Sequence, residues 1–503
     1  MGIDVLFYVE NGLTDENLAF AGVYVPATLK EKIQGVSRDS RFFYSLPAAY
    51  SGRLKEEKHA FVRDDVNDPA FWKKIFSETG ALNIAVVKAD AAFFDPEVFM
   101  EMGDVHLKSL AEFTFSENIP EGFACEICSS ELINHLPETD EKTLPLEKVI
   151  KSNINQFDVE LFYMEPDIRD KRISFRLTSP RERRIMENIF SVNSSVPRYK
   201  DVRGLIESHP EVLFTSPAYV ELELTGECSL DCLFCYRKTL NRKHGHMERA
   251  VYMKLIEFMR TEGLPYTLCF GGSGEPLDHP EFFAFMDAAV KEPLAELLVI
   301  ETNGIKADFN FKSYLEKPEN SKIKVIINNN AMDNSSYARF HCGNEYNRVF
   351  NNIISLSELN KSGERVYVQV MKIRETDEFE KEGDTKTYLD KFYDFWEGYR
   401  VPIILQKQDT YLGRIEDRTY SDLSPIKRIP CWHLQRDMYV LSDGTVSFCK
   451  QDVDGEHVHG NIAVSSPAEI LEKQKAAFLS DYAGKLCPSP DCASCDEWYT
   501  FNF

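Results

Sequence analysis

The chain has 503 residues, a length that favours roughly two to four domains over a single core. Hydrophobic residues make up 43% and charged residues 28%, which is the balance of a folded soluble protein. The net charge of −23 argues against a broad surface for nucleic acid, because such surfaces rest on lysine and arginine. The sequence begins without the basic and apolar segments of a signal peptide, and no run approaches the ~20 apolar residues that span a bilayer. We therefore expect a cytoplasmic protein that does not engage membranes.

The first 196 residues have the pattern of an α/β unit. Strands are expected at Asp4–Tyr8 and Asn83–Val87, with a helix at Phe71–Thr79 between them. Asp90 follows the second strand, at the end where ligand-binding residues often lie in open α/β sheets. With the later segment RISFRLTSPRERRIMENIF, this unit resembles the nucleotidyltransferase fold of enzymes that activate sugars with a nucleotide.

The resemblance implies a metal-binding carboxylate at Asp90 and a second one within Arg176–Pro180. No carboxylate stands in that second segment, and VENGLTDENLAFAG lacks the glycine-rich basic loop that would cradle a triphosphate. We therefore expect residues 1–196 to form a degenerate domain kept for binding or positioning. Prolines on either side make residues 197–214 the expected linker, with a helix near Val202–Ser208.

Residues 215–425 alternate strand and helix patterns, as in a parallel βα series. The expected strands are Tyr219–Leu224, Thr267–Phe270, Leu297–Glu301, Ile323–Asn328, Val366–Met371 and Ile403–Gln406. The expected helices are Arg249–Arg260, Glu281–Lys291, Arg348–Leu359 and Tyr388–Trp396. Six such units predict a partial (β/α)6 barrel whose chemistry lies at the carboxyl ends of its strands.

Polar motifs fall at those strand ends. The first strand leads into Cys228, Cys232 and Cys235, spaced C-x3-C-x2-C, the second into Gly271–Pro276, and the third into Glu301–Gly304. Three thiolates from one short loop leave one iron of a four-iron cluster open, because such a cluster normally takes four. Glycines allow close backbone approach to a ligand, and Glu275 is an acceptor suited to an ammonium group.

These motifs, with the aromatic Phe234 before the last cysteine, resemble the radical SAM superfamily. The resemblance implies that Cys228, Cys232 and Cys235 hold a [4Fe-4S] cluster whose open iron is chelated by S-adenosylmethionine. It implies that Gly272, Ser273, Gly274 and Glu275 receive the methionine ammonium, and that Asn303 and Asn328 lie near the ribose, so these residues and Phe234 form the expected cofactor site. It also implies a reductant such as a flavodoxin or ferredoxin.

A zinc site is the alternative for these three cysteines, with His244 or His246 as the fourth ligand. Zinc sites usually use paired C-x2-C units, and such a site would leave the glycine–glutamate run without a role. Four scattered cysteines are expected to pack in the interior: Cys125, Cys128, Cys269 and Cys342. Cys125 and Cys128 form a C-x2-C pair within a strand-like pattern, and a role on substrate is the alternative for Cys342, which follows the fourth strand.

Residues 426–503 carry five further cysteines, at 431, 449, 487, 492 and 495. A hairpin is expected over Leu441–Val446, with Asp443 and Gly444 at its turn, and it would bring Cys431 and Cys449 together. The distal C-x2-C pair, Cys492 and Cys495, completes four thiolates, enough for a closed [4Fe-4S] centre. Zinc on the same four residues is the alternative.

The tail resembles the SPASM and twitch extensions of radical SAM enzymes, which carry auxiliary clusters. Because it has fewer cysteines than the full SPASM set, we expect one auxiliary [4Fe-4S] cluster, held by Cys431, Cys449, Cys492 and Cys495. Cys487 is then a spare or an alternative ligand. The order of the three parts resembles the spiro-SPASM family.

The expected function is therefore reductive cleavage of S-adenosylmethionine to a 5′-deoxyadenosyl radical, which takes a hydrogen atom from substrate. The tail favours a peptide substrate, and the N-terminal part favours a carbohydrate or nucleotide-linked molecule. No catalytic side chain is identified. The alternative is a non-catalytic iron–sulfur or zinc scaffold with a sugar-nucleotide-binding module. Metal analysis separates the two, since two four-iron clusters require about eight irons per chain.

Overall fold

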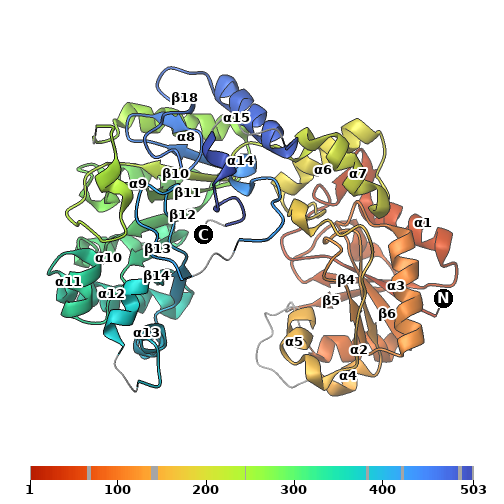
Figure 1. The fold of residues 1–503 in the computed structure, drawn as a ribbon. Coiled ribbons are helices and arrows are strands. Elements are labelled where there is room, and N and C mark those ends of the chain that lie inside the picture. Colours follow the sequence, from red (N-terminus) through yellow and green to blue (C-terminus); the bar gives the residue numbers. More distant parts are fainter. Residues whose placement is uncertain are drawn as a thin grey trace. The chain divides into compact units, whose positions relative to one another are not determined.

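The computed structural model describes residues 2–64, 69–136, 146–243, 245–380, 384–420, 424–484 and 490–500. The chain folds as two compact units, Met1–Leu213 and Phe214–Phe503 (Figure 1). The segment expected as a linker is largely helical. It contains α7 (Tyr199–Ser208) and the 3-10 turn η4 (Pro210–Leu213), both within the first unit.

The first unit is built on a seven-stranded mixed sheet with the order β5-β4-β1-β6-β8-β7-β9. Its strands are β1 (Asp4–Tyr8), β4 (Phe42–Pro47), β5 (Ala60–Arg63), β6 (Asn83–Lys88), β7 (Phe113–Phe115), β8 (Glu126–Ser129) and β9 (Val159–Leu161). β1 lies between β4 and β6, parallel to both, and its continuous apolar run is what a strand covered on both faces requires. A small hairpin pairs β2 (Ala19–Phe20) with β3 (Val23–Tyr24).

The helices of the first unit begin at residues that suit helix starts. α3 (Pro96–Ser109) is capped by Asp95, whose carboxylate accepts a hydrogen bond from the Glu97 amide, and Pro96 occupies the first turn. The other helices are α1 (Val25–Val36), α2 (Pro69–Thr79), α4 (Leu132–His135), α5 (Leu146–Ser152) and α6 (Pro180–Asn193).

The second unit is built on a nine-stranded sheet with the order β15-β14-β13-β12-β11-β10-β16-β17-β18. Its strands are β10 (Tyr219–Glu223), β11 (Tyr266–Gly271), β12 (Ala295–Thr302), β13 (Ile323–Asn328), β14 (Val366–Met371), β15 (Ile403–Gln406), β16 (Asp437–Val440), β17 (Thr445–Ser447) and β18 (Val458–Asn461). Strands β10 to β15 are parallel and adjacent in chain order, which is the expected (β/α)6 arrangement. β16 pairs parallel with β10, and the antiparallel β17 and β18 follow, so the tail extends the same sheet.

Most helices of the second unit pack apolar side chains on this sheet (Figure 1). They are α8 (Arg249–Glu262), α9 (Phe282–Lys291), α10 (Phe309–Leu315), α11 (Asn334–His341), α12 (Tyr346–Ser357), α13 (Tyr388–Glu397), α14 (Trp432–Arg436) and α15 (Pro467–Tyr482). One apolar core includes residues of the parallel strands β10 to β14 and also Met438, Val446 and Ile470 of the tail. The tail therefore shares a core with the strands that precede it.

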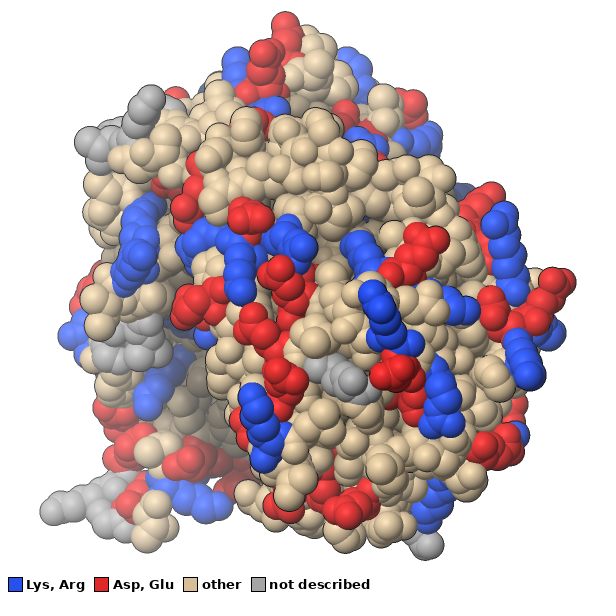
Figure 2. Space-filling model, turned by 90° about the vertical axis from the view of Figure 1, so that its right-hand side faces the viewer, with Lys and Arg blue, Asp and Glu red and all other residues tan. Residues whose placement is uncertain are grey.

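Three of the four scattered cysteines are buried as expected: Cys125, Cys128 and Cys269. The expectation for Cys342 is wrong, because this residue is exposed and ends α11 in a left-handed conformation, with φ 54°. On the face shown in Figure 2, acidic and basic side chains intermingle and form no continuous basic field. No helix in the described part of the chain combines the length and apolarity needed to cross a membrane.

Candidate active site

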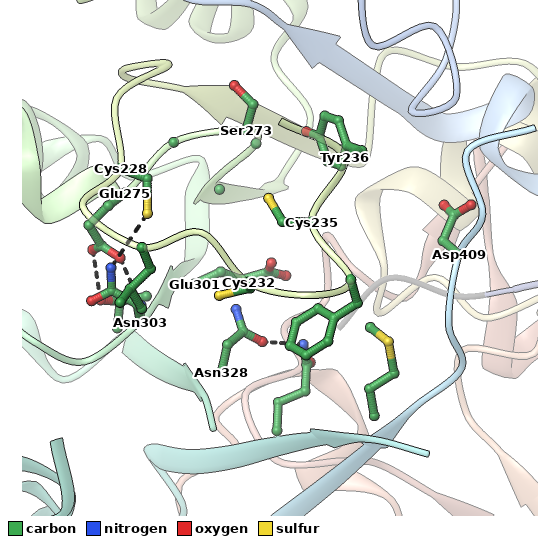
Figure 3. Close-up of a pocket in the computed structure, with 18 of the residues that line it drawn as sticks. Cys228, Cys232, Cys235, Tyr236, Ser273, Glu275, Glu301, Asn303, Asn328 and Asp409 are labelled. Carbon is green, nitrogen blue, oxygen red and sulfur yellow. Dashed lines mark hydrogen bonds between the residues drawn. The ribbon is translucent and has the colours of Figure 1, made fainter. Parts of the chain in front are cut away.

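The three cysteines of the C-x3-C-x2-C motif lie on the loop that follows β10. Their side chains point into one space, as Figure 3 shows, and all three line a cavity of about 180 Å³. The same cavity is lined by Gly271–Glu275 after β11 and by Thr302 and Asn303 at the end of β12. The structure therefore brings together the motifs that the sequence placed at three strand ends.

The glycine-rich loop packs directly on the cysteine loop. A Cβ atom on Gly274 would lie 2.0 Å from the carbonyl oxygen of Thr225, and the Glu275 amide donates to the Glu227 carbonyl at 2.7 Å. Gly272 has φ +87°, and a Cβ there would lie 2.8 Å from the Cβ of Glu223. These glycines are thus required for contact between protein segments, a reason that the sequence pattern did not reveal.

Glu275 connects the end of β12 to the glycine-rich loop through hydrogen bonds. Its Oε1 accepts hydrogen bonds from the Thr302 hydroxyl at 2.7 Å and the Leu277 amide at 3.1 Å. Its Oε2 accepts one from the Asn303 amide at 2.7 Å, which leaves that oxygen able to accept from one more donor. Burial raises the pKa of Glu275 to about 7, although these hydrogen bonds oppose the shift.

The other predicted cofactor residues also line this cavity. The Asn303 side-chain nitrogen lies 3.7 Å from the Cys228 sulfur. The Asn328 oxygen accepts from Gln369 Nε2 at 2.6 Å, and Gln369 also donates to Gln406 at 2.7 Å. The Phe234 ring lies edge-on to that of His341, with centroids 5.8 Å apart. Asn328 and Gln369 thus form an amide row on the wall of the cavity.

The donor set fits a metal centre held by three thiolates. Burial raises the pKa of Cys228, Cys232 and Cys235, so these sulfurs need positive charge before they give up their protons. No fourth cysteine of the described chain lines this cavity. The sulfurs surround the space without converging on one point, since no three Cys, His, Asp or Glu side chains among the described residues are placed to share a single ion.

The two histidines considered as zinc ligands do not complete this set. His246 does not line the cavity, and its Nε2 lies 3.7 Å from a carboxylate oxygen of Glu227. His244 lies outside the described residues.

The tail cysteines form a second group around a larger cavity of about 490 Å³. Cys431 precedes α14, Cys449 follows β17, and both line this cavity with Cys495. Burial raises the pKa of Cys495 to about 11, and the charge of Cys492 adds to the shift. Burial also raises the pKa of Cys449, with further contributions from Cys495 and Cys492. Three of the four expected ligands, Cys431, Cys449 and Cys495, thus line one cavity, whereas Cys492 does not line it and is linked to the group by its charge on Cys449 and Cys495. Cys487 lies outside the described residues.

The two cavities adjoin. Six residues line both of them: Glu301, Gln369, Gln406, Asp409, Tyr411 and Lys450. Lys450 Nζ lies 3.8 Å from Glu221 Oε2, and that carboxylate raises the pKa of Lys450. Burial raises the pKa of Asp409 to about 6. A polar, charged wall therefore lies between the two groups of cysteines.

Sequence reasoning missed two features beside the cysteine loop. Glu223, on β10, accepts a bidentate pair of hydrogen bonds from the Arg242 guanidinium and one from the Ser273 hydroxyl at 2.6 Å. His341, at the end of α11, has its Nδ1 3.3 Å from the Cys232 sulfur. A glutamate in an apolar strand hinted at the first, but no local pattern pointed to the second.

In the first unit, Asp90 is fully buried and bonded to protein through both oxygens. Its Oδ1 accepts from Arg176 Nε at 2.7 Å, and its Oδ2 accepts from the Thr178 amide at 3.2 Å. The guanidinium also lies 3.2 Å from carboxylate oxygens of Glu10 and Glu121. A side-chain cation therefore occupies the place beside Asp90 that the resemblance gave to a metal.

Comparison with protein families decides the class of the second unit. Residues 222–382 match the model of the radical SAM superfamily, and residues 431–496 match that of SPASM, an iron–sulfur cluster-binding domain. The chain carries a radical SAM domain and a SPASM domain. It is thus a radical SAM enzyme, and these domains imply a [4Fe-4S] cluster with S-adenosylmethionine in the core and an auxiliary cluster in the tail.

Individual relatives are more distant. The radical SAM chain is 27% identical over 366 residues to an uncharacterized protein of Treponema pallidum (strain Nichols), covering 70% of this chain and 97% of that one. It is 31% identical over 86 residues to the tungsten-containing aldehyde ferredoxin oxidoreductase cofactor-modifying protein of Pyrococcus furiosus, covering 17% of this chain and 24% of that one. The structure of Streptococcus suis SuiB bound to precursor peptide SuiA aligns with a TM-score of 0.42 at 12% identity, covering 60% of this chain and 76% of SuiB.

Proposed function

We propose that this radical SAM enzyme abstracts a hydrogen atom from a polar substrate held in the two adjoining cavities. The observation that carries the proposal is that cysteines of both groups face cavities that share six lining residues. When bound at Cys228, Cys232 and Cys235, the cluster with S-adenosylmethionine supplies a 5′-deoxyadenosyl radical by reductive cleavage.

Residues of the glycine-rich loop bind and orient the methionine end of S-adenosylmethionine. Glu275 Oε2 has one protein donor and can accept a second hydrogen bond from the methionine ammonium. Gly274 keeps the backbone of this loop beside the cysteine loop, and Gly272 and Ser273 keep it beside Glu223 on β10. Asn303 and Asn328, with Phe234, form the wall that faces the nucleoside part.

The tail group, Cys431, Cys449, Cys492 and Cys495, holds the auxiliary cluster. Burial, and to a smaller extent the mutual repulsion of the thiolates, raises the pKa of Cys431 and Cys449 and disfavours their ionised state without metal, so bound iron is what stabilises these thiolates together. Electrons for the core site come from a small reductant such as a flavodoxin or ferredoxin.

The substrate belongs to one of two classes: a peptide, or a small molecule that is a carbohydrate or is linked to a nucleotide. The shared wall favours a polar substrate, because it is formed by carboxylates, amides and an ammonium group: Glu301, Gln369, Gln406, Asp409 and Lys450. The nucleotidyltransferase-like part is kept for binding or positioning, a role supported by Asp90, whose oxygens are both engaged by Arg176 and Thr178.

The test is replacement of Cys228, Cys232 and Cys235 together by alanine. We expect the reconstituted anaerobic variant to lose 5′-deoxyadenosine production from S-adenosylmethionine under reducing conditions. Cys342→Ser, at an exposed cysteine outside both groups, is the matched control and should retain it. Unchanged production in the triple variant would refute the proposed function.

A further inference from the structure

His341 is the last residue of α11, and each of its ring nitrogens faces a defined partner. The side chain is almost fully buried, with 2% exposure. Its Nδ1 lies 3.3 Å from the Cys232 sulfur, and its Nε2 lies 3.1 Å from the backbone nitrogen of Asn330. The residue therefore bridges a cysteine of the proposed cluster site and the loop that follows β13.

The Asn330 contact determines which nitrogen of His341 carries the proton. A backbone amide can only donate, so Nε2 must present its lone pair to it. In the neutral ring the proton is then on Nδ1, aimed at the Cys232 sulfur. A protonated ring is excluded, because its Nε2–H would oppose the Asn330 N–H at hydrogen-bond distance.

Both sides of this bridge are held in place. Asn330 exchanges two hydrogen bonds with the backbone of Met371, each at 3.2 Å, and its carbonyl accepts from the Tyr388 hydroxyl at 2.7 Å. On the cysteine loop, the Leu233 amide donates to the Phe340 carbonyl at 2.9 Å. The Nδ1–H group is thus fixed relative to Cys232.

From this geometry we infer that His341 is a positioning residue that donates a hydrogen bond to the Cys232 thiolate and raises the reduction potential of the cluster. The inference rests on the proposed function, because it requires Cys232 to be a cluster ligand. A donor on the sulfur withdraws electron density from it and stabilises the extra negative charge of the reduced state. Asn303, whose nitrogen lies 3.7 Å from Cys228, is a longer contact of the same kind.

Two substitutions distinguish the role of Nδ1 as a hydrogen-bond donor from the role of Nε2 as an acceptor. In His341→Asn, the side-chain amide nitrogen can take the place of Nδ1 and keep a donor on Cys232. In His341→Gln, the longer side chain can place its oxygen near Nε2 and accept from Asn330, without a donor on the sulfur. If His341 had only a structural role, the two variants would have the same cluster reduction potential.

The experiment is a redox titration of the reconstituted full-length proteins, followed by electron paramagnetic resonance. The cluster in question is the one whose signal changes when S-adenosylmethionine is added. At the wild-type midpoint, we expect the ratio of reduced to oxidised clusters in His341→Gln to be lower by up to about tenfold, a shift of about 59 mV to more negative potential. His341→Asn should stay near the wild-type midpoint.

The outcomes are distinguishable. Equal midpoints in wild type and His341→Gln would overturn the inference, as would an equal shift in both variants or loss of the cluster from both. Loss of the cluster from His341→Gln alone would support it, because the donor is then needed to retain the ligand. Failure of wild type to bind iron at Cys228, Cys232 and Cys235 would instead refute the proposed function.

Discussion

Glu223 shows how one buried carboxylate organises the surroundings of the cysteine loop. It is 2% exposed on β10, between the Arg242 guanidinium, the Ser273 hydroxyl and the Ser442 amide. Burial alone would raise the pKa of Glu223, but the hydrogen bonds and charge of Arg242 outweigh it and lower the pKa below its usual 4.5. The carboxylate therefore connects the glycine-rich loop with the β16–β17 turn.

Replacing Glu223 by glutamine should lower the free energy of unfolding by about 3–5 kcal/mol, because Arg242 would be left buried without its counter-ion. Urea unfolding measures the change. Since the folded pKa lies below the unfolded one, this contribution is present above pH 4.5 and lost as the pH falls through the folded value. Glu257→Gln, in an exposed pair with Arg260, should cost far less, because water screens that pair. Similar costs for the two variants would contradict the assigned role.

Gly274→Ala should displace the cysteine loop, because the added methyl group would lie 2.0 Å from the Thr225 carbonyl oxygen. We expect the reconstituted variant to lose about four of the irons that wild type binds. Gly245→Ala is the control, since a Cβ there meets nothing within 4 Å. An iron content equal to wild type in Gly274→Ala would show that the loop can yield at this contact.

At the scale of elements, the sequence predicted well those strands that are mostly apolar. β1, β13, β14 and β15 have the predicted bounds, and β11 and β12 are longer than predicted by one or two residues at each end. Sequence periodicity, however, gives information only about residues that are close together in the chain. The contact of His341 with Cys232 joins residues 109 positions apart, and the Glu223–Arg242 pair spans a loop of irregular backbone. Such contacts depend on where α11 and that loop are placed by the fold.

Helix α3 is connected to the first unit's sheet through a buried histidine. His106 is 1% exposed, with Nδ1 2.8 Å from the Thr114 hydroxyl on β7 and Nε2 3.0 Å from Asn83 Oδ1 on β6. Burial lowers the pKa of His106 to about 4 from its usual 6.5. Because the unfolded chain binds the proton more readily, the contribution of His106 is present above pH 6.5 and declines as the pH falls towards 4.

Between pH 7 and pH 5 this linkage should cost wild type about 2 kcal/mol of stability. His106→Gln should lose that part of the pH dependence, because the glutamine amide does not titrate and can keep the bond to Asn83 that Nε2 makes. Urea unfolding at the two pH values gives the comparison. His59→Gln, at an exposed histidine, should keep the wild-type dependence. A pH dependence in His106→Gln equal to that of wild type would place the titrating group elsewhere.

At the scale of the whole chain, the tail that carries Cys431, Cys449, Cys492 and Cys495 shares a sheet with the radical SAM domain, but its cysteines are separate from those of the loop after β10. β16 pairs with β10, so the tail and the radical SAM domain share one sheet and one apolar core. The loops after β10, β11 and β12 nevertheless supply all of the cysteines, glycines and Glu275 that line the smaller cavity. The core site should therefore assemble without the ligands of the tail.

The double variant Cys449→Ser/Cys495→Ser tests this independence. We expect iron to fall from about eight to about four per chain, with matching sulfide, because only the tail cluster is lost. Production of 5′-deoxyadenosine from S-adenosylmethionine should persist, since the three cysteines after β10 are unchanged, while the Cys342→Ser control should keep all of its iron. If the double variant also stopped cleaving S-adenosylmethionine, the two groups of cysteines would have to assemble as one unit, held together through the sheet that β10 and β16 share.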